Sequence, residues 1–173
     1  SGPTYAPVKN PTQFGEDTWA KHPLKKIVSG SHHSLALTED KKVFGWGDSE
    51  CGQIGRLLKT RDKKVKAQNE AVGAKDAVNI FCGNYHSFYQ NSKGNIYAWG
   101  LNQYGQLGIG NLLSPTPTPT LIKEFKEVEV LEIVGGEHHS LACTKDGRVF
   151  AWGRNDEGCI GVGDTISIYN KEK

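Results

Sequence analysis

The stretch that decides the fold is EIVGGEHHSLACTKDGRVFAWG, residues 132–153. It places two adjacent histidines after two glycines and closes on Trp-Gly. The same pattern occurs twice more, as KIVSGSHHSLALTEDKKVFGWG at 26–47 and as NIFCGNYHSFYQNSKGNIYAWG at 79–100. Each copy begins 53 residues after the one before it, and several residue types keep that register. Such an internal repeat is typical of solenoids and propellers.

Within the repeat, some positions are fixed and others vary. A glycine, a histidine and a tryptophan recur in every copy: Gly30, Gly83 and Gly136; His33, His86 and His139; Trp46, Trp99 and Trp152. We interpret this recurring histidine as structural. The position before it varies, as His32, Tyr85 and His138. A variable position in a fixed frame is where a repeat protein can encode binding specificity.

Each copy predicts an antiparallel hairpin. Residues 33–37 alternate as a strand does, and a return strand follows at 43–46. In the later copies the turns contain Gly-Asn or Asp-Gly, which favour tight hairpins. A small sheet cannot cover its own apolar faces, so neighbouring units must stack. We expect the three recurring tryptophans to lie buried between sheets, and the recurring glycines to allow close approach or positive φ.

The spacing predicts an all-β fold, a β-propeller whose blades are four-stranded sheets. A straight solenoid is the alternative. The repeats divide the chain at 26–78, 79–131 and 132–173, the last incomplete, and supply about three blades. Residues 1–25 lack the frame and are expected to be trailing strands of a preceding blade or a linker. Open sheet edges need cover, so other segments or other chains should complete the ring.

The composition and motifs give little support for a catalytic, cofactor or metal site in this chain. The net charge is +2, and the four cysteines occupy different repeat positions without a C-x-x-C pair. Adjacent residues of a strand point to opposite faces, so His32 and His33 should not share a metal ion. No nucleophile elbow or phosphate loop occurs, so we expect no enzyme, no cofactor and no metal. Free thiols favour the cytosol or nucleus, and no apolar run approaches the roughly 20 residues of a membrane span.

Two connectors have a biased composition. Residues 56–66 hold six basic residues and one acid. Lys63, Lys64 and Lys66 are therefore candidates for a nucleic-acid or chromatin contact, with a solvated loop as the alternative. Residues 114–120 alternate proline with threonine and predict an extended connector.

The frame Gly-x-x-His-Ser, followed by Trp-Gly and Gly-Gln-Leu-Gly, resembles the repeat of the regulator of chromosome condensation family over about residues 26–165. Three stretches resemble, in order, the middle-to-late blades of the exchange factors for the GTPase Ran. They are Gly52-Gln-Ile-Gly-Arg56 with its basic connector, 81–108, and Gly135-Gly-Glu-His-His139. The resemblance implies a seven-bladed propeller when complete. It also implies a nuclear protein, with cytoplasmic as the alternative, that binds Ran and promotes GDP release without covalent chemistry.

The resemblance also implies site residues. The positions that face Ran correspond to His32, Arg56, Tyr85 and His138, while the opposite face would contact histones and DNA. Family members often have an acid where His32 stands, and their nucleotide-displacing wedge belongs to an earlier blade. Two other functions are compatible with the sequence. One is an interaction scaffold of the same superfamily with a partner other than Ran, such as a ubiquitin-ligase or ciliary scaffold, and the other is a chromatin-binding module.

Overall fold

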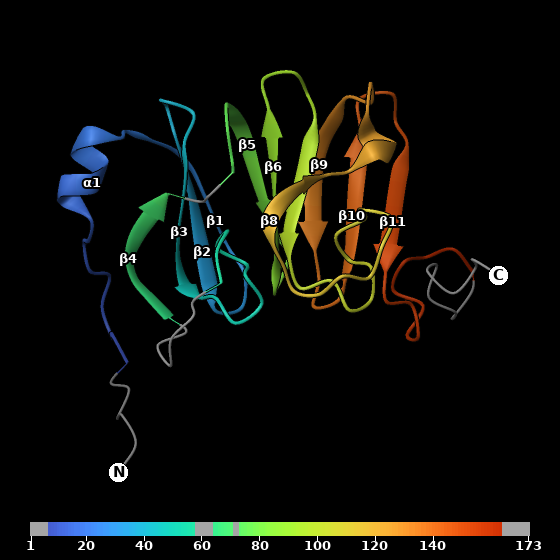
Figure 1. The fold of residues 1–173 in the computed structure, drawn as a ribbon, viewed down its shortest axis with the longest axis horizontal. Helices are drawn as coiled ribbons and strands as arrows, with labels where there is room; N and C mark the ends of the chain where they lie inside the picture. The colour runs from blue at the N-terminus through green and yellow to red at the C-terminus, as the bar shows by residue number, and fades with distance from the viewer. Residues whose placement is uncertain (1–6, 58–63, 71–72, 164–173) are drawn as a thin grey trace, which may run out of the picture.

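The structure is a computed structural model that describes residues 7–57, 64–70 and 73–163, with the backbone alone for 64–70 (Figure 1). In these ranges a short helix, α1, precedes eleven strands, and a 3-10 turn, η1, lies before β9. The elements are α1 (Glu16–Lys21), β1 (Leu24–Ser29), β2 (His33–Thr38), β3 (Val43–Asp48), β4 (Lys64–Glu70), β5 (Ala77–Cys82), β6 (His86–Asn91), β7 (Ile96–Gly100), β8 (Thr116–Leu121), η1 (Lys123–Phe125), β9 (Val130–Gly135), β10 (His139–Thr144) and β11 (Val149–Gly153).

The strands form three antiparallel sheets, one for each copy of the repeat. The first sheet has the order β1-β2-β3-β4, the second β5-β6-β7-β8, and the third β9-β10-β11. Figure 1 shows the sheets side by side, in chain order from α1 to β11. The predicted all-β architecture of about three propeller blades is confirmed.

The hairpin turns explain the repeated register of the strands. Gly94 and Gly147 have φ of 82° and 83°, the left-handed conformation that glycine adopts without a steric cost. Lys41 stands at the same repeat position with φ 62°. In each sheet the first residue of the second strand along the chain (β2, β6 or β10) pairs with the glycine of Trp-Gly, as His33 does with Gly47. The three hairpins therefore share one register, and their turns lie at the same edge of the three sheets.

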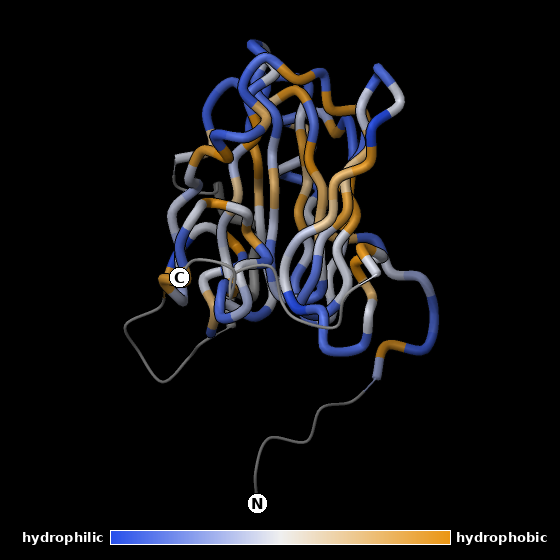
Figure 2. The backbone as a smooth tube through the Cα atoms, turned by 90° about the vertical axis from the view of Figure 1, so that its right-hand side faces the viewer, coloured by the Kyte–Doolittle hydropathy of each residue, from blue (hydrophilic) through white to orange (hydrophobic). Residues whose placement is uncertain are grey.

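The core lies between the sheets, at two contacts that we call the first and second seams. The first seam, between the first and second sheets, buries residues such as Leu35, Ile80 and Trp99. The second seam, between the second and third sheets, buries residues such as Phe88 and Ile133. In Figure 2 the apolar residues follow the strands, and the hydrophilic ones gather at the loops. Stacking of neighbouring sheets thus supplies the core that no single sheet could form.

The recurring glycines Gly30, Gly83 and Gly136 lie against the recurring histidines, in a region between the sheets that we call the hub. A Cβ on Gly83 would come within 2.6 Å of His86 Nε2, and one on Gly30 within 2.6 Å of His33 Nδ1. The amide of Asn84 donates to the carbonyl of Gly136 in the next sheet at 3.0 Å. The predicted close approach is confirmed. Positive φ occurs instead at the glycines of Trp-Gly: Gly47, Gly100 and Gly153.

The three recurring tryptophans differ in burial. Trp99 is fully buried in the first seam, as predicted, while Trp152 is half-buried in the second. For Trp46 the prediction of a site between two sheets is wrong, because no sheet precedes the first in the described residues. Trp46 packs instead against Phe14 and Trp19, with ring centroids 5.5 and 6.1 Å away.

The segment before β1 differs from the trailing strands expected at 1–25. Its described part, 7–23, forms no strand and contains α1. This helix of six residues is too short to show a helical period. Trp19 of α1 lies two repeat lengths before Phe125 of η1. Trp19 therefore occupies the repeat position that Phe125 occupies in η1, although the described part of the segment contains no strand. The alternative that this segment is a linker stays a prediction.

Candidate interface on the loop rim

One edge of the three sheets carries the variable positions of the repeat. We call it the loop rim and define it by the turns 30–32, 83–85 and 136–138 together with the loops that follow β3, β7 and β11. The opposite edge, with the turns 39–42, 92–95 and 145–148, is the hairpin rim. In Figure 1 the loop rim is at the bottom and the hairpin rim at the top.

A hydrogen-bond relay between sheets fixes the turns of the loop rim. At the first seam, Ser87 Oγ donates to the Gln53 carbonyl at 2.6 Å, and Trp99 Nε1 donates to the same oxygen at 2.9 Å. His33 Nε2 lies 3.0 Å from Ser87 Oγ. Because the serine proton is already used, the histidine must be the donor. The turn 30–32 is thus bonded to the second sheet one residue after its variable position.

The second seam repeats this relay one unit later. Ser140 Oγ and Trp152 Nε1 both donate to the Gln106 carbonyl at 2.8 Å. His86 Nε2 lies 2.8 Å from Ser140 Oγ. Burial lowers the pKa of His33 to about 4 and that of His86 to about 3, so both rings are neutral at pH 7. The prediction that these two histidines are structural is confirmed.

At the second seam the rim side chains form a column, defined as Tyr85, His138, Tyr104 and Arg154. The Tyr85 and His138 rings stack with centroids 6.1 Å apart, and Tyr104 lies 4.9 Å beyond His138. The Arg154 guanidinium lies 5.2 Å from the Tyr104 centroid. Asp156 accepts two bonds of 2.7 Å from Arg154 Nε. Two of the predicted site residues, Tyr85 and His138, are therefore brought together from neighbouring sheets.

His138 is neutral near pH 7 in this column. Burial is the main cause, and it lowers the pKa of the ring below its ordinary value. Glu137, whose carboxylate lies 3.6 Å from His138 Nε2, raises the pKa, but by less than burial lowers it. His138 therefore presents an uncharged ring between two tyrosines.

The other two predicted site residues lie at the first sheet. His32 is exposed in the turn after β1. Arg56 is half-buried in the loop after β3, where its carbonyl accepts a bond from Ser49 Oγ. Within the described part of the chain, no ring contact joins His32 to Tyr85. The structure thus gathers one pair of the predicted residues and leaves the other pair apart from it.

Two members of the column, Tyr104 and Arg154, were not predicted as site residues. Arg154 follows Trp-Gly, at a position that is Asp48 in the first copy and Leu101 in the second. Tyr104 corresponds to Cys51 in the first copy. Both positions vary inside a fixed frame, which is the signal that identified His32, Tyr85 and His138. The same signal, applied to the loops, would have found them.

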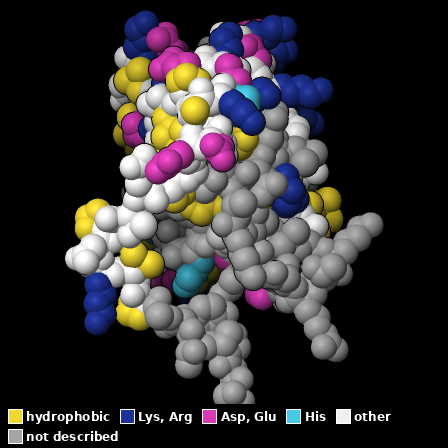
Figure 3. Space-filling view, turned by 90° about the vertical axis from the view of Figure 1, so that its left-hand side faces the viewer, with side chains coloured by type: hydrophobic (Ala, Val, Ile, Leu, Met, Phe, Trp, Pro, Cys, Tyr) yellow, Lys and Arg dark blue, Asp and Glu magenta, His cyan; other side chains and the backbone are white. Residues whose placement is uncertain are grey.

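The basic connector falls mainly outside the placed side chains. Lys63 lies outside the described residues, and Lys64 and Lys66 lie in β4, where only the backbone is described. On the hairpin rim, charges of both signs are mixed (Figure 3). Lys41 pairs with Asp76 at 2.9 Å, and further pairs join Lys145 to Glu129 and Arg148 to Asp146. That rim is therefore not a uniformly basic surface.

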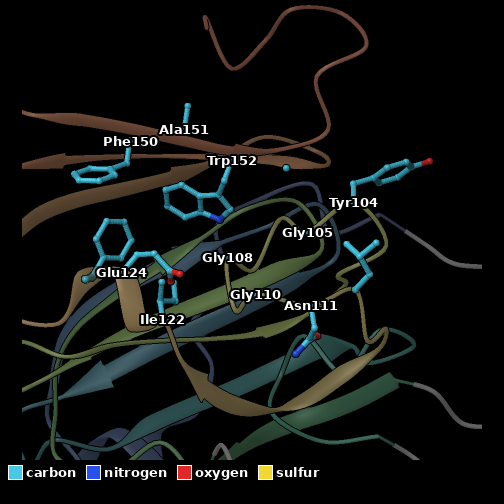
Figure 4. A pocket seen from close by; sticks show the side chains of 13 residues that line it. Tyr104, Gly105, Gly108, Gly110, Asn111, Ile122, Glu124, Phe150, Ala151 and Trp152 are labelled. Atoms are coloured by element: carbon cyan, nitrogen blue, oxygen red, sulfur yellow. The ribbon is translucent and has the colours of Figure 1, made fainter. Parts of the chain in front are cut away.

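A cavity of about 430 Å³ lies beside Trp152 and the loop that follows β7 (Figure 4). Gly105 and Gly108 line it. At the first seam the place that matches Gly105 is Gly52, against which Pro117 of β8 packs. The cavity thus corresponds to a packing position of the repeat. No group of His, Cys, Asp or Glu able to hold a metal ion occurs in the described part of the chain.

Three stacked antiparallel sheets with a shared hub relay and variable rim loops define a partial β-propeller of the interaction type. A family model described as "RCC1-like domain" matches residues 2–173. The chain belongs to this family. Over the described ranges, no helix has the length and apolarity needed to cross a membrane.

Relatives and solved structures agree with this assignment. Protein pim1 of Schizosaccharomyces pombe is 37% identical over 146 residues, covering 80% of this chain and 26% of its own length. The ultraviolet-B receptor UVR8 of Arabidopsis thaliana is 37% identical over 146 residues, covering 83% of this chain and 32% of its own. The structure of Prp20p from Saccharomyces cerevisiae superposes with a TM-score of 0.72 at 30% identity. It covers 79% of this chain and 32% of Prp20p, so the chain spans a third or less of each of these proteins.

Proposed function

We propose that this chain is part of a guanine-nucleotide exchange factor for the GTPase Ran, which it contacts through the loop rim. The contact residues are His32, Arg56, Tyr85 and His138. The chain acts as a regulator and makes or breaks no covalent bond. The proposal places it in the nucleus, with the rest of the propeller supplied by other segments or chains.

The observation that carries the proposal is the contrast within each repeat. The hub relay is the same at both seams, while the turn residue directly before each relay histidine differs. Tyr85 and His138 meet in a stacked pair at the rim. Rigid aromatic side chains at a solvent-facing edge are the groups that most often dominate protein interfaces. Support also comes from Prp20p, which was described with its binding properties to Gsp1p, the yeast Ran, and to histones.

An exchange factor stabilises its GTPase without nucleotide, so the test is binding of the 173-residue chain to Ran in each nucleotide state. We expect tighter binding to nucleotide-free Ran than to Ran with GDP. Tyr85→Ala should weaken this binding, while Lys93→Ala, on the hairpin rim, should not. Equal binding by all nucleotide states, or none, would remove the proposal.

A second candidate is an interaction scaffold of the same family with a different partner. UVR8, a receptor of another function, is as similar to this chain as pim1 is. His32 in place of the acid common among Ran exchange factors also favours this candidate. Capture of a partner other than Ran that depends on Tyr85, by a chain that does not bind Ran, would support it.

Chromatin binding through Lys63, Lys64 and Lys66 stays a prediction. Charge reversal at these three lysines should weaken nucleosome binding and reduce its dependence on salt, because phosphate contacts release counterions. Unchanged binding would remove this role from the connector.

A further inference from the structure

The second seam indicates the charge of the partner that it fits. We propose that the column and the carboxylates beside it receive a basic segment of the partner, with a Lys or Arg side chain against the tyrosine rings. This inference deepens the proposed function and rests on it. Three sets of observations support it: the rings, the charges and the position of Arg154.

The rings of the column form a site that attracts cations. Tyr85, His138 and Tyr104 come from two sheets and hold one another in place, so little side-chain freedom remains to be lost on binding. The face of a tyrosine ring attracts a cation within about 6 Å. Arg154 already lies 5.2 Å from the Tyr104 centroid, so this ring face accepts a guanidinium within the chain itself.

The charges around the column are mainly negative. Glu137, Asp156 and Glu157 lie on the adjoining turn and loop, and Arg154 is the basic residue among them. The Glu137 side chain is 62% exposed. His138 adds no charge near pH 7, because burial lowers its pKa. The seam therefore offers aromatic faces bordered by carboxylates.

An acidic partner would find Arg154 already engaged. Its guanidinium is held by both carboxylate oxygens of Asp156, with Nε 2.7 Å from each. An incoming carboxylate would have to displace Asp156 and approach Glu137 as well. A basic side chain meets neither obstacle and competes only with Arg154 for the ring of Tyr104.

This competition gives the test a definite sign. The measurement is the Kd of the chain for nucleotide-free Ran, at low and at high salt. Arg154→Ala frees both Tyr104 and Asp156, so we expect binding about threefold tighter. Tyr104→Ala removes the ring, and we expect binding about tenfold weaker. Tyr104→Phe keeps the ring and should bind like the wild type.

The matched control is Gln103→Ala, which alters an exposed residue next to Tyr104 that is outside the column. We expect its Kd to stay within about twofold of the wild type, and wild-type binding to weaken as salt rises. Thermal unfolding of each variant checks the fold, and Tyr104→Phe with Arg154→Ala keeps the test valid if Tyr104→Ala is unstable.

Two outcomes would overturn the inference and leave the proposed function in place. Weaker binding by Arg154→Ala would mean that the seam takes an acidic group. Wild-type binding by both Tyr104→Ala and Arg154→Ala would mean that no basic group of the partner docks on the Tyr104 ring, while Tyr85 and His138 can still contact Ran. If the wild-type chain binds no form of Ran, the proposed function and the inference fall together.

Discussion

The first and second seams are built on one hub and differ at the rim. At both, a serine and a tryptophan of one sheet donate to a glutamine carbonyl of the sheet before it, and a neutral histidine donates to the serine. At the rim, the second seam carries the column of Tyr85, His138, Tyr104 and Arg154. The matching positions at the first seam are His32, Tyr85, Cys51 and Leu101. The first seam therefore has one tyrosine at these positions where the second seam has two.

The difference separates what the repeat needs from what it can vary. The hub residues are buried and bonded across sheets, so a change there disturbs the stacking of the propeller. The rim residues are half-buried or exposed, and their replacement leaves the relay intact. Stability should therefore respond to hub changes, and partner binding to rim changes.

The largest effect should come from the tryptophans, and it should differ between the seams. Trp99 is fully buried, so Trp99→Ala should lower the free energy of unfolding by about 3–5 kcal/mol. Trp152 is half-buried beside the cavity, so Trp152→Ala should cost about 2 kcal/mol. Urea unfolding monitored by circular dichroism measures both. Equal losses would show that the two seams are equally packed.

A methyl group at the hub should be nearly as damaging. Gly83→Ala places a Cβ against the His86 ring and should cost about 3 kcal/mol through overpacking. Gly94→Ala is the control, because its Cβ would meet nothing within 4 Å. The positive φ of Gly94 disfavours alanine, so we expect a loss of about 1 kcal/mol from backbone strain alone. A loss at Gly83 no larger than that at Gly94 would contradict a tight contact between Gly83 and the His86 ring.

The relay histidines should make stability depend on pH. Their folded pKa values, about 4 for His33 and about 3 for His86, lie below the ordinary 6.5. The unfolded chain therefore binds more protons at mildly acid pH, and their contribution is complete above pH 6.5 and is lost as pH falls toward 4. The expected slope is about 1.4 kcal/mol per pH unit for each histidine.

Unfolding of the wild type and of His86→Gln between pH 7 and pH 4.5 checks this expectation. The variant should be less stable at pH 7 and should show a shallower dependence on pH. An identical slope in both proteins would contradict a buried neutral His86.

The smallest effect is expected on the hairpin rim of the first seam. Lys41 and Asp76 form an ion pair of 2.9 Å between the first and second sheets, and both side chains are about half exposed. Exposed pairs contribute little, so Lys41→Ala should change the free energy of unfolding by less than about 0.5 kcal/mol. A loss above 1 kcal/mol would mean that this pair, and not the hub, joins the sheets.

Much of the fold could be predicted because the same sequence pattern occurs in three copies. The spacing of His33, His86 and Trp99 predicted sheets that stack on one another, and the hub relay explains why these residue types recur. The short helix α1 could not be predicted, because six residues carry no period. The half-burial of Trp46 depends on what lies before the first sheet, which the repeat frame itself does not specify.

The site was predicted in part for a similar reason. Tyr85 and His138 stood out as variable positions next to a fixed histidine. Tyr104 and Arg154 lie in the loops, and their approach to His138 depends on how neighbouring sheets stack. A pattern read along one copy does not show which loops of two copies meet.

Hydrogen exchange of the chain with and without nucleotide-free Ran tests the central claim most directly. The account predicts that Ran slows exchange at 83–85, 101–105, 136–138 and 154–157 on the loop rim of the second seam. Exchange at the hairpin turns 39–42, 92–95 and 145–148 should stay unchanged. Protection confined to those hairpin turns would contradict the assignment of the loop rim as the partner surface.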